Sequence, residues 1–278
     1  MESTIREKLA NGSYRLGQKL PTQVELATEF GVSRDTIQRA LRKLKAEGWV
    51  ETRQGSGMRV ARVQEVEPPD RHPERRGTAS LGSLIHYAFE QPEVRLDTFA
   101  LTSETLWNHL NAQVDRVINR EIRPPELVHM RILLPSETVK LAYPAAKDPE
   151  DERAWQRWRT MARRYAGEIK DLLKKLEALK VKDAHAEIRR VPMTPQHKLY
   201  VVNNDDVLFG LYEVFERTIL LDDGDSVEAL DVLGLGSVLS HYRKDPEGVE
   251  SHEGRIHATM QASFESYWKH LSHVDTTV

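Results

Sequence analysis

The sequence predicts an α+β protein in two parts: a small helical module that ends in a β-hairpin, and a larger α/β domain with a mixed sheet. Three observations lead to this prediction. Helix and hairpin signals follow one another within residues 1–62. A stretch rich in proline and charge comes next, at 63–77. In 78–278, strand and helix patterns alternate before a run of strands.

Composition limits the class of protein. The chain has 278 residues, 39% hydrophobic and 30% charged, as expected for a globular protein of about two domains. It has no cysteine, which excludes disulfides and thiolate metal sites. It also lacks an apolar run near the roughly 18 residues of a membrane helix, and its first ten residues lack the apolar core of a signal peptide. We therefore expect a cytoplasmic protein with no membrane partner.

Charge differs between the two parts. Residues 1–62 contain 12 Lys and Arg against 7 Asp and Glu, whereas the remaining residues contain 28 against 36. A basic module attached to an acidic domain indicates that only the module meets a polyanion, although ordinary scatter can produce a difference of this size.

The small module begins with three predicted helices. Ile5 and Leu9 form one face of a short first helix. Thr22 is a good N-cap for the second helix, and Glu25 completes a capping box. Gly31, free to adopt a positive φ, ends that helix.

The third helix starts almost at once. Ser33 caps it, and Ile37, Leu41 and Leu44 recur at helical spacing. Such a short connection forces a sharp crossing of the two helices, which is helix-turn-helix geometry. The predicted core residues are Leu26, Ile37, Leu41, Leu44 and Trp49.

A polar helix face and a basic hairpin complete the module. The third helix exposes Arg34, Asp35, Gln38, Arg39, Arg42 and Lys43. Residues 49–53 and 58–60 alternate like two strands, and Gln54–Gly57 forms a flexible tip between Arg53 and Arg59. A basic hairpin of this kind can approach phosphates or enter the minor groove.

The module resembles the DNA-binding domain of the GntR family of bacterial regulators over LPTQVELATEFGVSRDTIQRALRKLKAEGWVETRQGSGMRV. The resemblance implies a winged helix-turn-helix on double-stranded DNA. It places Arg34 and Thr36 against bases or phosphates, and Gln54 and Gly55 near the minor groove. The DNA-binding residues that it implies are Thr22, Ser33, Arg34, Asp35, Thr36, Gln38, Arg39, Arg53, Gln54, Gly55, Ser56 and Gly57.

Two positions depart from the family pattern. Val24 stands where many members have a phosphate-contacting Arg, and Gln38 stands where Arg is common. We therefore expect altered operator preference, with DNA binding retained. Taken alone, Arg34 can be a solvated charge of a helix face; the motif favours DNA contact.

Residues 63–77 contain three prolines and almost no apolar side chain, which predicts a solvated, semi-extended linker. Beyond it, helices are predicted at 104–121, 151–180 and 257–271. The apolar stripe of 151–180 fits a coiled-coil seam and packing on a sheet equally well. Strands are predicted at 94–102, 129–134, 184–193, 198–203, 207–218 and 227–239, with a hairpin turn at 203–206.

This order of elements, with TPQHKLYVVNNDDVLFGLYE, resembles the phospholipase D-like fold and its His-x-Lys-x4-Asp signature. Placing Lys198 on the signature Lys puts Gln196 at the His position and Asn203 at the Asp position. An amide cannot attack phosphorus as imidazole does. His197 is adjacent to Lys198, so on a strand it points to the opposite face. The resemblance implies a domain without catalysis, in which Lys198, Gln196 and Asn203 form a candidate ligand site; an ordinary structural lysine is the alternative.

No cofactor or metal site is predicted. His252-Glu253 followed by His257 misses the spacing that brings two metal-binding histidines onto one helix face. No glycine-rich phosphate loop occurs, and no serine lies in a nucleophile elbow.

Two functions remain open. The first is a non-enzymatic transcriptional regulator that binds palindromic operators as a homodimer and responds to a small-molecule effector. Repression is the usual outcome in the family that the module resembles. The second is a DNA-tethered enzyme that processes phosphodiesters.

Overall fold

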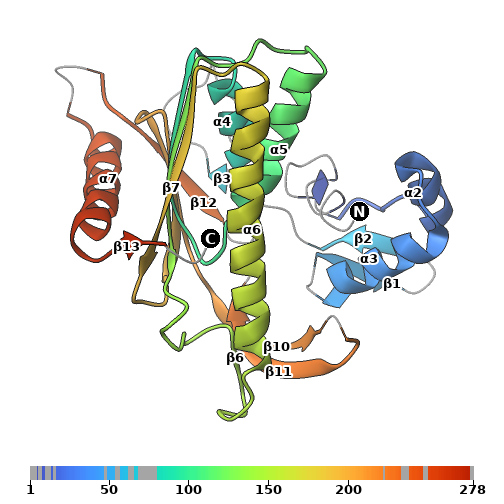
Figure 1. Cartoon of the computed structure of the whole chain (residues 1–278). Coiled ribbons are helices and arrows are strands. Elements are labelled where there is room, and N and C mark those ends of the chain that lie inside the picture. Colours follow the sequence, from blue (N-terminus) through green and yellow to red (C-terminus); the bar gives the residue numbers. More distant parts are fainter. Residues whose placement is uncertain are drawn as a thin grey trace.

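The computed structural model of the chain describes residues 5, 8–9, 14, 17–46, 49–53, 57–61, 66–67, 80–221, 223–232, 238–246 and 250–275. It contains a small N-terminal module and a larger, sheet-rich domain, as the sequence predicts (Figure 1).

The small module has the predicted helix-turn-helix. Its described elements are α2 (Gln23–Phe30), α3 (Arg34–Ala46), β1 (Val50–Arg53) and β2 (Gly57–Val60). The Thr22 hydroxyl accepts the backbone N–H of Glu25, and the Glu25 carboxylate accepts that of Thr22, so the capping box is confirmed. Gly31 has φ 63°, the left-handed conformation that ends a helix.

One apolar cluster holds this module together. Ile5 and Leu9 are helical and completely buried, as expected for the first helix. The predicted core residues Leu26, Ile37, Leu41, Leu44 and Trp49 are all 3% exposed or less. The antiparallel hairpin β1–β2 closes the cluster through Val50 and Val60, which pair with each other.

An eight-stranded mixed sheet forms the centre of the larger domain. Its order is β13-β7-β5-β4-β8-β9-β12-β3. The pairs β4–β5, β5–β7 and β12–β3 are parallel and the others antiparallel. The strands are β3 (Val66–Glu67), β4 (Glu93–Phe99), β5 (Leu127–Pro135), β7 (Asp183–Val191), β8 (His197–Val202), β9 (Asp206–Leu211), β12 (Leu239–Arg243) and β13 (His273–Val274).

Helices cover both faces of the sheet (Figure 1). The helices are α4 (Leu81–Ala88), α5 (Glu104–Ile118), α6 (Arg153–Ala178) and α7 (His252–His270). The first three pack on one face, where Tyr200 joins the largest apolar cluster. Helix α7 packs on the other face, where neighbouring Leu199 lies against Phe264. Alternate residues of β8 therefore enter different cores, as the two-residue period of a strand requires.

Helix α6 packs on the sheet. Ile169, Leu172 and Leu176 are at most 1% exposed and belong to the same cluster as Met130 and Ile132 of β5. Of the two alternatives for the apolar stripe of 151–180, the observed one is packing on a sheet.

A second sheet holds three strands in the order β10-β11-β6. They are β10 (Val214–Leu220), β11 (Ser226–Val232) and β6 (Ala145–Ala146). The prediction of one strand over 207–218 is wrong, because the chain leaves the large sheet after Leu211 and starts β10 at Val214. The prediction of one strand over 227–239 is wrong as well, since β11 ends at Val232 and β12 begins at Leu239.

The predicted linker also needs a correction. Val66 and Glu67 form β3, which pairs in parallel with Leu239 and Ser240 of β12. These two residues of 63–77 thus belong to the edge of the large sheet; the rest of that stretch lies outside the described residues. Helix α4 was not predicted either, although Ser80 caps it through the N–H of Ser83 at 3.0 Å.

Candidate functional site

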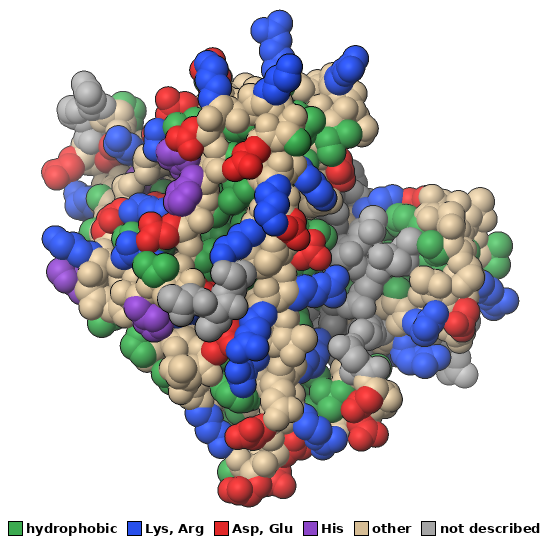
Figure 2. Space-filling view, viewed as in Figure 1, with side chains coloured by type: hydrophobic (Ala, Val, Ile, Leu, Met, Phe, Trp, Pro, Cys, Tyr) green, Lys and Arg blue, Asp and Glu red, His purple; other side chains and the backbone are tan. Residues whose placement is uncertain are grey.

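Helix α3 has one apolar face and one cationic face. Ile37, Leu41 and Leu44 point into the core of the module, and the charged residues of the helix lie on the opposite side. Figure 2 shows Lys and Arg side chains on the surface that this module forms. A helix that is anchored on one face and cationic on the other can lie in a DNA groove. The polar residues of α3 that are exposed in the described part of the chain are Arg34, Asp35, Gln38, Arg39, Arg42 and Lys45.

The beginning of α3 is fixed by side-chain contacts. The Ser33 hydroxyl accepts the N–H of Thr36 at 3.2 Å and lies 2.9 Å from the Thr36 hydroxyl. Arg34 is exposed, and its Nε donates to Oε1 of Gln23 at 3.4 Å, which links α2 to α3. The cap therefore uses Ser33 and Thr36, whereas the Arg34 guanidinium remains on the surface.

Three other predicted DNA-binding residues on the helices, Asp35, Arg39 and Thr22, make weak or local contacts. Asp35 and Arg39 form an exposed ion pair with 3.4 Å between Oδ2 and Nε. Exposed pairs contribute little to stability, so Arg39 can exchange Asp35 for a phosphate. Thr22 uses its hydroxyl and its N–H in the capping box of α2, which leaves its carbonyl group as the first acceptor of that helix.

The hairpin is formed as predicted, but its tip lies outside the described residues. Gln54, Gly55 and Ser56 belong to that tip. Gly57 follows it with φ 80°, a conformation that disfavours any residue with a side chain. A Cβ at Gly57 would also approach Cε of Lys19 to 3.1 Å. Arg53, which precedes the tip, ends β1.

Lys19 is a cation that sequence reasoning missed. It is exposed, its backbone forms a β-bridge with Arg59, and its side chain reaches Gly57 at the tip end of the hairpin. The turn-rich stretch before Pro21 gave no signal for this, because the contact depends on tertiary pairing. Lys19 adds a positive charge beside the predicted DNA-binding hairpin.

In the larger domain, Lys198 is the most unusual side chain. It is 1% exposed, and its Nζ has no hydrogen-bond partner among the described residues. Burial lowers the pKa of Lys198 to about 7, since a buried ammonium loses its hydration. The Tyr212 ring lies beside it, with its centroid 5.5 Å from Nζ. Tyr212 is fixed in turn, as its hydroxyl accepts the N–H of Leu101 at 3.0 Å.

The structure does not bring the three predicted ligand-site residues together. Gln196 is exposed and precedes β8, where its carbonyl group accepts the N–H of Tyr212. Asn203 follows the opposite end of β8, about 16 Å from Lys198 at the rise of a strand. It has φ 52°, and its Oδ1 accepts the N–H of Arg95 at 2.8 Å. Its side chain therefore stabilises the turn that follows β8.

His197 lies on the other side of the sheet from Lys198, as predicted. Its ring packs between Phe99 and Phe209, with centroids at 5.3 and 5.0 Å. Burial lowers the pKa of His197. The His197 imidazole and the Lys198 ammonium thus lie on opposite faces of the sheet. They do not form a nucleophile pair for phosphodiester chemistry.

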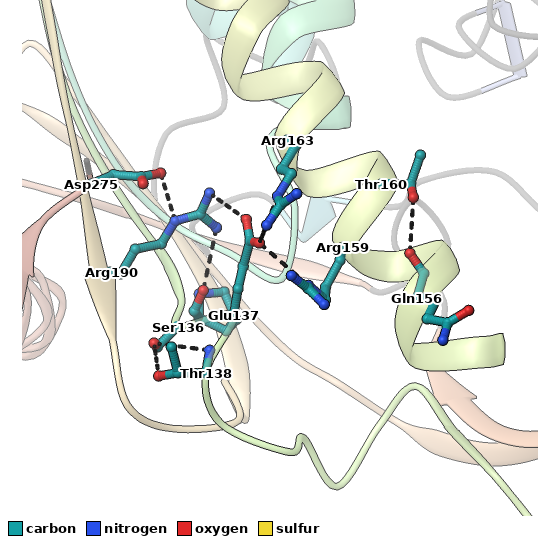
Figure 3. Close-up of polar contacts among 10 residues, drawn as sticks. Ser136, Glu137, Thr138, Gln156, Arg159, Thr160, Arg163, Arg190 and Asp275 are labelled. Carbon is teal, nitrogen blue, oxygen red and sulfur yellow. Dashed lines mark hydrogen bonds and ion pairs between the residues drawn. The ribbon is translucent and has the colours of Figure 1, made fainter. Parts of the chain in front are cut away.

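A charged network lies where β5 and β7 end beside α6 (Figure 3). Glu137 accepts from Arg163 at 2.7 Å, from Arg190 at 3.1 Å and from Arg159 at 3.4 Å. Arg190 also donates to Asp275 at 2.7 Å. Three guanidinium groups thus share two carboxylates. Each of these guanidinium groups has a carboxylate partner, which indicates that the network has a structural role.

The described ranges contain neither a metal-ligand cluster nor a membrane-spanning helix. No group of three His, Asp or Glu side chains is close enough there to hold a metal ion. No helix within these ranges combines the length and apolar character needed to cross a membrane.

Known proteins resemble part of this chain. Residues 2–60 match the family model of bacterial regulatory proteins, gntR family. The Uxu operon regulator of Haemophilus influenzae is 31% identical over 118 residues, which are 42% of each chain. The Mannosyl-D-glycerate transport/metabolism system repressor MngR of Escherichia coli is 50% identical over 56 residues, 20% of this chain and 23% of MngR. The Exu regulon transcriptional regulator of E. coli is 38% identical over 64 residues, 23% of this chain and 25% of the relative.

The chain therefore spans less than half of the length of each of these relatives. The matches support a helix-turn-helix module of the gntR family at the N-terminus, and they leave most of the larger domain without a counterpart.

Proposed function

We propose that this chain is a sequence-specific DNA-binding transcriptional regulator that acts as a repressor. The observation that carries the proposal is the anchored helix α3, whose outer face is polar and largely cationic, in a module of the gntR family. The relatives agree in kind, since two are named as regulators of an operon or regulon and one as a repressor.

In this proposal the chain binds DNA as a homodimer. One helix-turn-helix reads only half of an operator, and a two-fold symmetric pair reads a palindrome. The DNA contacts are those implied by the motif, with Arg34 and Thr36 at the start of α3 and Gln54 and Gly55 at the hairpin tip. The larger domain provides the dimer contacts and the response to an effector.

The larger domain is proposed as a phospholipase D-like fold without catalysis. Its support is the parallel β4–β5–β7 core with α5 and α6 on one face, and Lys198 on a strand that pairs with β4. Gln196 and His197 offer no imidazole on the Lys198 side. Lys198 itself is proposed to meet an anionic group, phosphate or carboxylate, when a ligand reaches it.

A gel-shift titration on the promoter region of the protein's own gene tests DNA binding. Arg34→Ala is expected to weaken binding about tenfold or more, because it removes a contact to a base or phosphate. Arg123→Ala is the matched control, since Arg123 is an exposed arginine of the larger domain. If both variants bind like the parent chain, α3 is not the recognition helix.

The enzyme alternative has a separate assay. Phosphodiester turnover by the purified chain that disappears in Lys198→Ala would replace the regulator proposal by a DNA-tethered enzyme. Sedimentation of the chain as a monomer at micromolar concentration, with and without operator DNA, would contradict the dimer.

A further inference from the structure

A pocket lies between the connection from β5 to α6 and the first turn of α6. Its volume is about 180 Å³, and its lining includes Thr138, Lys140, Leu141, Asp148, Glu152 and Trp155. An apolar cavity of about 150 Å³ accommodates benzene, so this pocket has room for one small ring. It is separate from the DNA-binding module and from Lys198, which does not line it.

The inner wall of the pocket is apolar and fixed. Leu141 is 2% exposed, and Trp155 packs against the same cluster. The Arg159 guanidinium covers one face of the Trp155 ring, 4.5 Å from its centroid, and Arg159 is itself paired with Glu137. Trp155 Nε1 is buried and has no acceptor within the described part of the chain. This wall offers a flat aromatic surface.

The outer wall carries charges of both signs. Lys140 Nζ donates to the carbonyl group of Pro149 at 2.9 Å, and Asp148 Oδ1 accepts the N–H of Glu150 at 3.0 Å. These hydrogen bonds fix the segment 140–150, which forms the outer rim of the pocket. Asp151 is paired with Arg153 at 2.8 Å. Figure 2 shows acidic side chains gathered at the lower end of the molecule, where α6 begins.

This lining selects against a strongly charged ligand. An anion would meet Asp148, Asp151 and Glu152. A cation would have to share these carboxylates with Lys140 and with Arg153, which already pairs with Asp151. A neutral compound with several hydroxyl groups avoids both, because each hydroxyl can donate to a carboxylate and accept from an ammonium. Its ring face can lie against Trp155 and Leu141.

We propose that this pocket binds a neutral polyhydroxylated ring compound of monosaccharide size and that this compound is the effector of the regulator. The proposed binding site depends only on the pocket, whereas the role of the compound as an effector rests on the proposed function.

The position of the pocket supplies a route to the DNA-binding module. Ala145 and Ala146 line the pocket and form β6, which pairs with Leu230 and Ala229 of β11. Strand β11 pairs along its whole length with β10, and β10 lies against α3. A ligand in the pocket therefore contacts β6, at one edge of the three-stranded sheet. The strand at the other edge, β10, lies against α3 (Figure 1).

Isothermal calorimetry on the full chain without DNA tests the binding site. The probes are neutral aldohexoses, aldopentoses and hexitols, with sugar phosphates and choline as charged comparisons. A neutral probe is expected to bind with a dissociation constant of about 1 mM or tighter. Binding of the charged probes alone, or of none, would overturn the proposal.

Variants locate the site. Glu152→Ala and Trp155→Phe should each weaken binding of the neutral probe about tenfold, because they remove a rim carboxylate and part of the aromatic surface. Glu150→Ala is the matched control, since this exposed neighbour does not line the pocket and gives only its backbone N–H to Asp148. Glu152 is exposed and makes no side-chain cap bond, so its variant should fold even if Trp155→Phe does not. Unchanged affinity in Glu152→Ala and in any folded Trp155→Phe would refute this location.

A gel shift with the bound probe separates the two proposals. A probe that binds the chain and changes its operator affinity at least about fivefold supports both. A chain that binds the probe but no DNA keeps the site and loses the proposed function. A chain that binds both, without any effect of the probe on DNA affinity, loses the regulatory role of the pocket.

Discussion

Arg190 and Asp275 form an ion pair in which Nε lies 2.7 Å from Oδ2, although 85 positions separate them in the chain. Their side chains are 4% and 3% exposed. Arg190 lies near the end of β7, and Asp275 follows β13, the strand that pairs with β7 at the edge of the sheet. The pair therefore fastens the end of the chain to the sheet (Figure 3).

Breaking this pair should destabilise the larger domain. Asp275→Asn leaves a buried guanidinium short of one carboxylate, and we expect the free energy of unfolding to fall by about 3 kcal/mol. Urea denaturation followed by tryptophan fluorescence measures the loss. Asp171→Asn is the control, since Asp171 forms an exposed pair with Lys174 and should leave stability nearly unchanged. Equal effects of the two variants would show that burial does not strengthen the Arg190 pair.

His109 should make the protein less stable in mild acid. It is 5% exposed, its Nε2 has no partner among the described residues, and burial lowers its pKa from 6.5 to about 4. Between these two values the unfolded chain binds a proton that the folded chain excludes, so stability rises with pH through this window. We expect a loss of about 2 kcal/mol between pH 7 and pH 5 from this group.

The variant His109→Phe isolates this contribution. Urea midpoints at pH 7 and pH 5 should differ less in the variant than in the parent chain, because phenylalanine does not titrate. His197, whose pKa burial also lowers, leaves part of the slope in both proteins. A variant with the full slope of the parent would mean that His109 is not responsible.

The small module was predictable because its signals are local. Thr22 with Glu25 and Gly31 mark the limits of α2 within ten residues, and the structure places each at the cap that it predicts. The break between β9 and β10 had no such signal. Apolar alternation continues through it, and only tertiary pairing moves the chain from the large sheet to the small one after Leu211.

The larger domain's candidate site shows a similar limit. Spacing in the sequence suggested that Lys198 and Asn203 act together, but five positions along an extended strand separate them widely. Lys198 is buried beside Tyr212, which packs against a cluster that contains Trp158 of α6, from elsewhere in the chain. Likewise, strand β3 consists of two residues, and its partner β12 lies more than 170 positions later.

Lys198 should reduce stability at neutral pH. Its pKa falls from 10.5 to about 7 in the folded chain, so between pH 7 and pH 10.5 the unfolded chain binds the extra proton and stability rises with pH by up to about 1.4 kcal/mol per unit. Lys198→Met keeps the length of the side chain and removes the charge. We expect the variant to be more stable than the parent at pH 7 and to lose this slope.

Inorganic phosphate distinguishes a ligand-binding lysine from a merely buried one. If Lys198 meets an anion, 10 to 100 mM phosphate should raise the melting temperature of the parent relative to the same ionic strength of chloride, and not that of Lys198→Met. Equal responses of the two proteins would leave Lys198 as a structural residue and remove it from the proposed effector response.

Lys19 should contribute to DNA affinity without changing sequence preference. Its side chain lies beside Gly57, next to the tip of the hairpin, where its exposed ammonium can meet a phosphate. Each phosphate contact releases about one counterion, so Lys19→Ala should reduce the slope of log affinity against log salt by about one unit and weaken operator and random DNA alike. Fluorescence anisotropy from 50 to 200 mM salt measures both. Arg34→Ala should differ by losing more affinity for the operator than for random DNA, and a Lys19→Ala variant that behaved in this way would place Lys19 against a base.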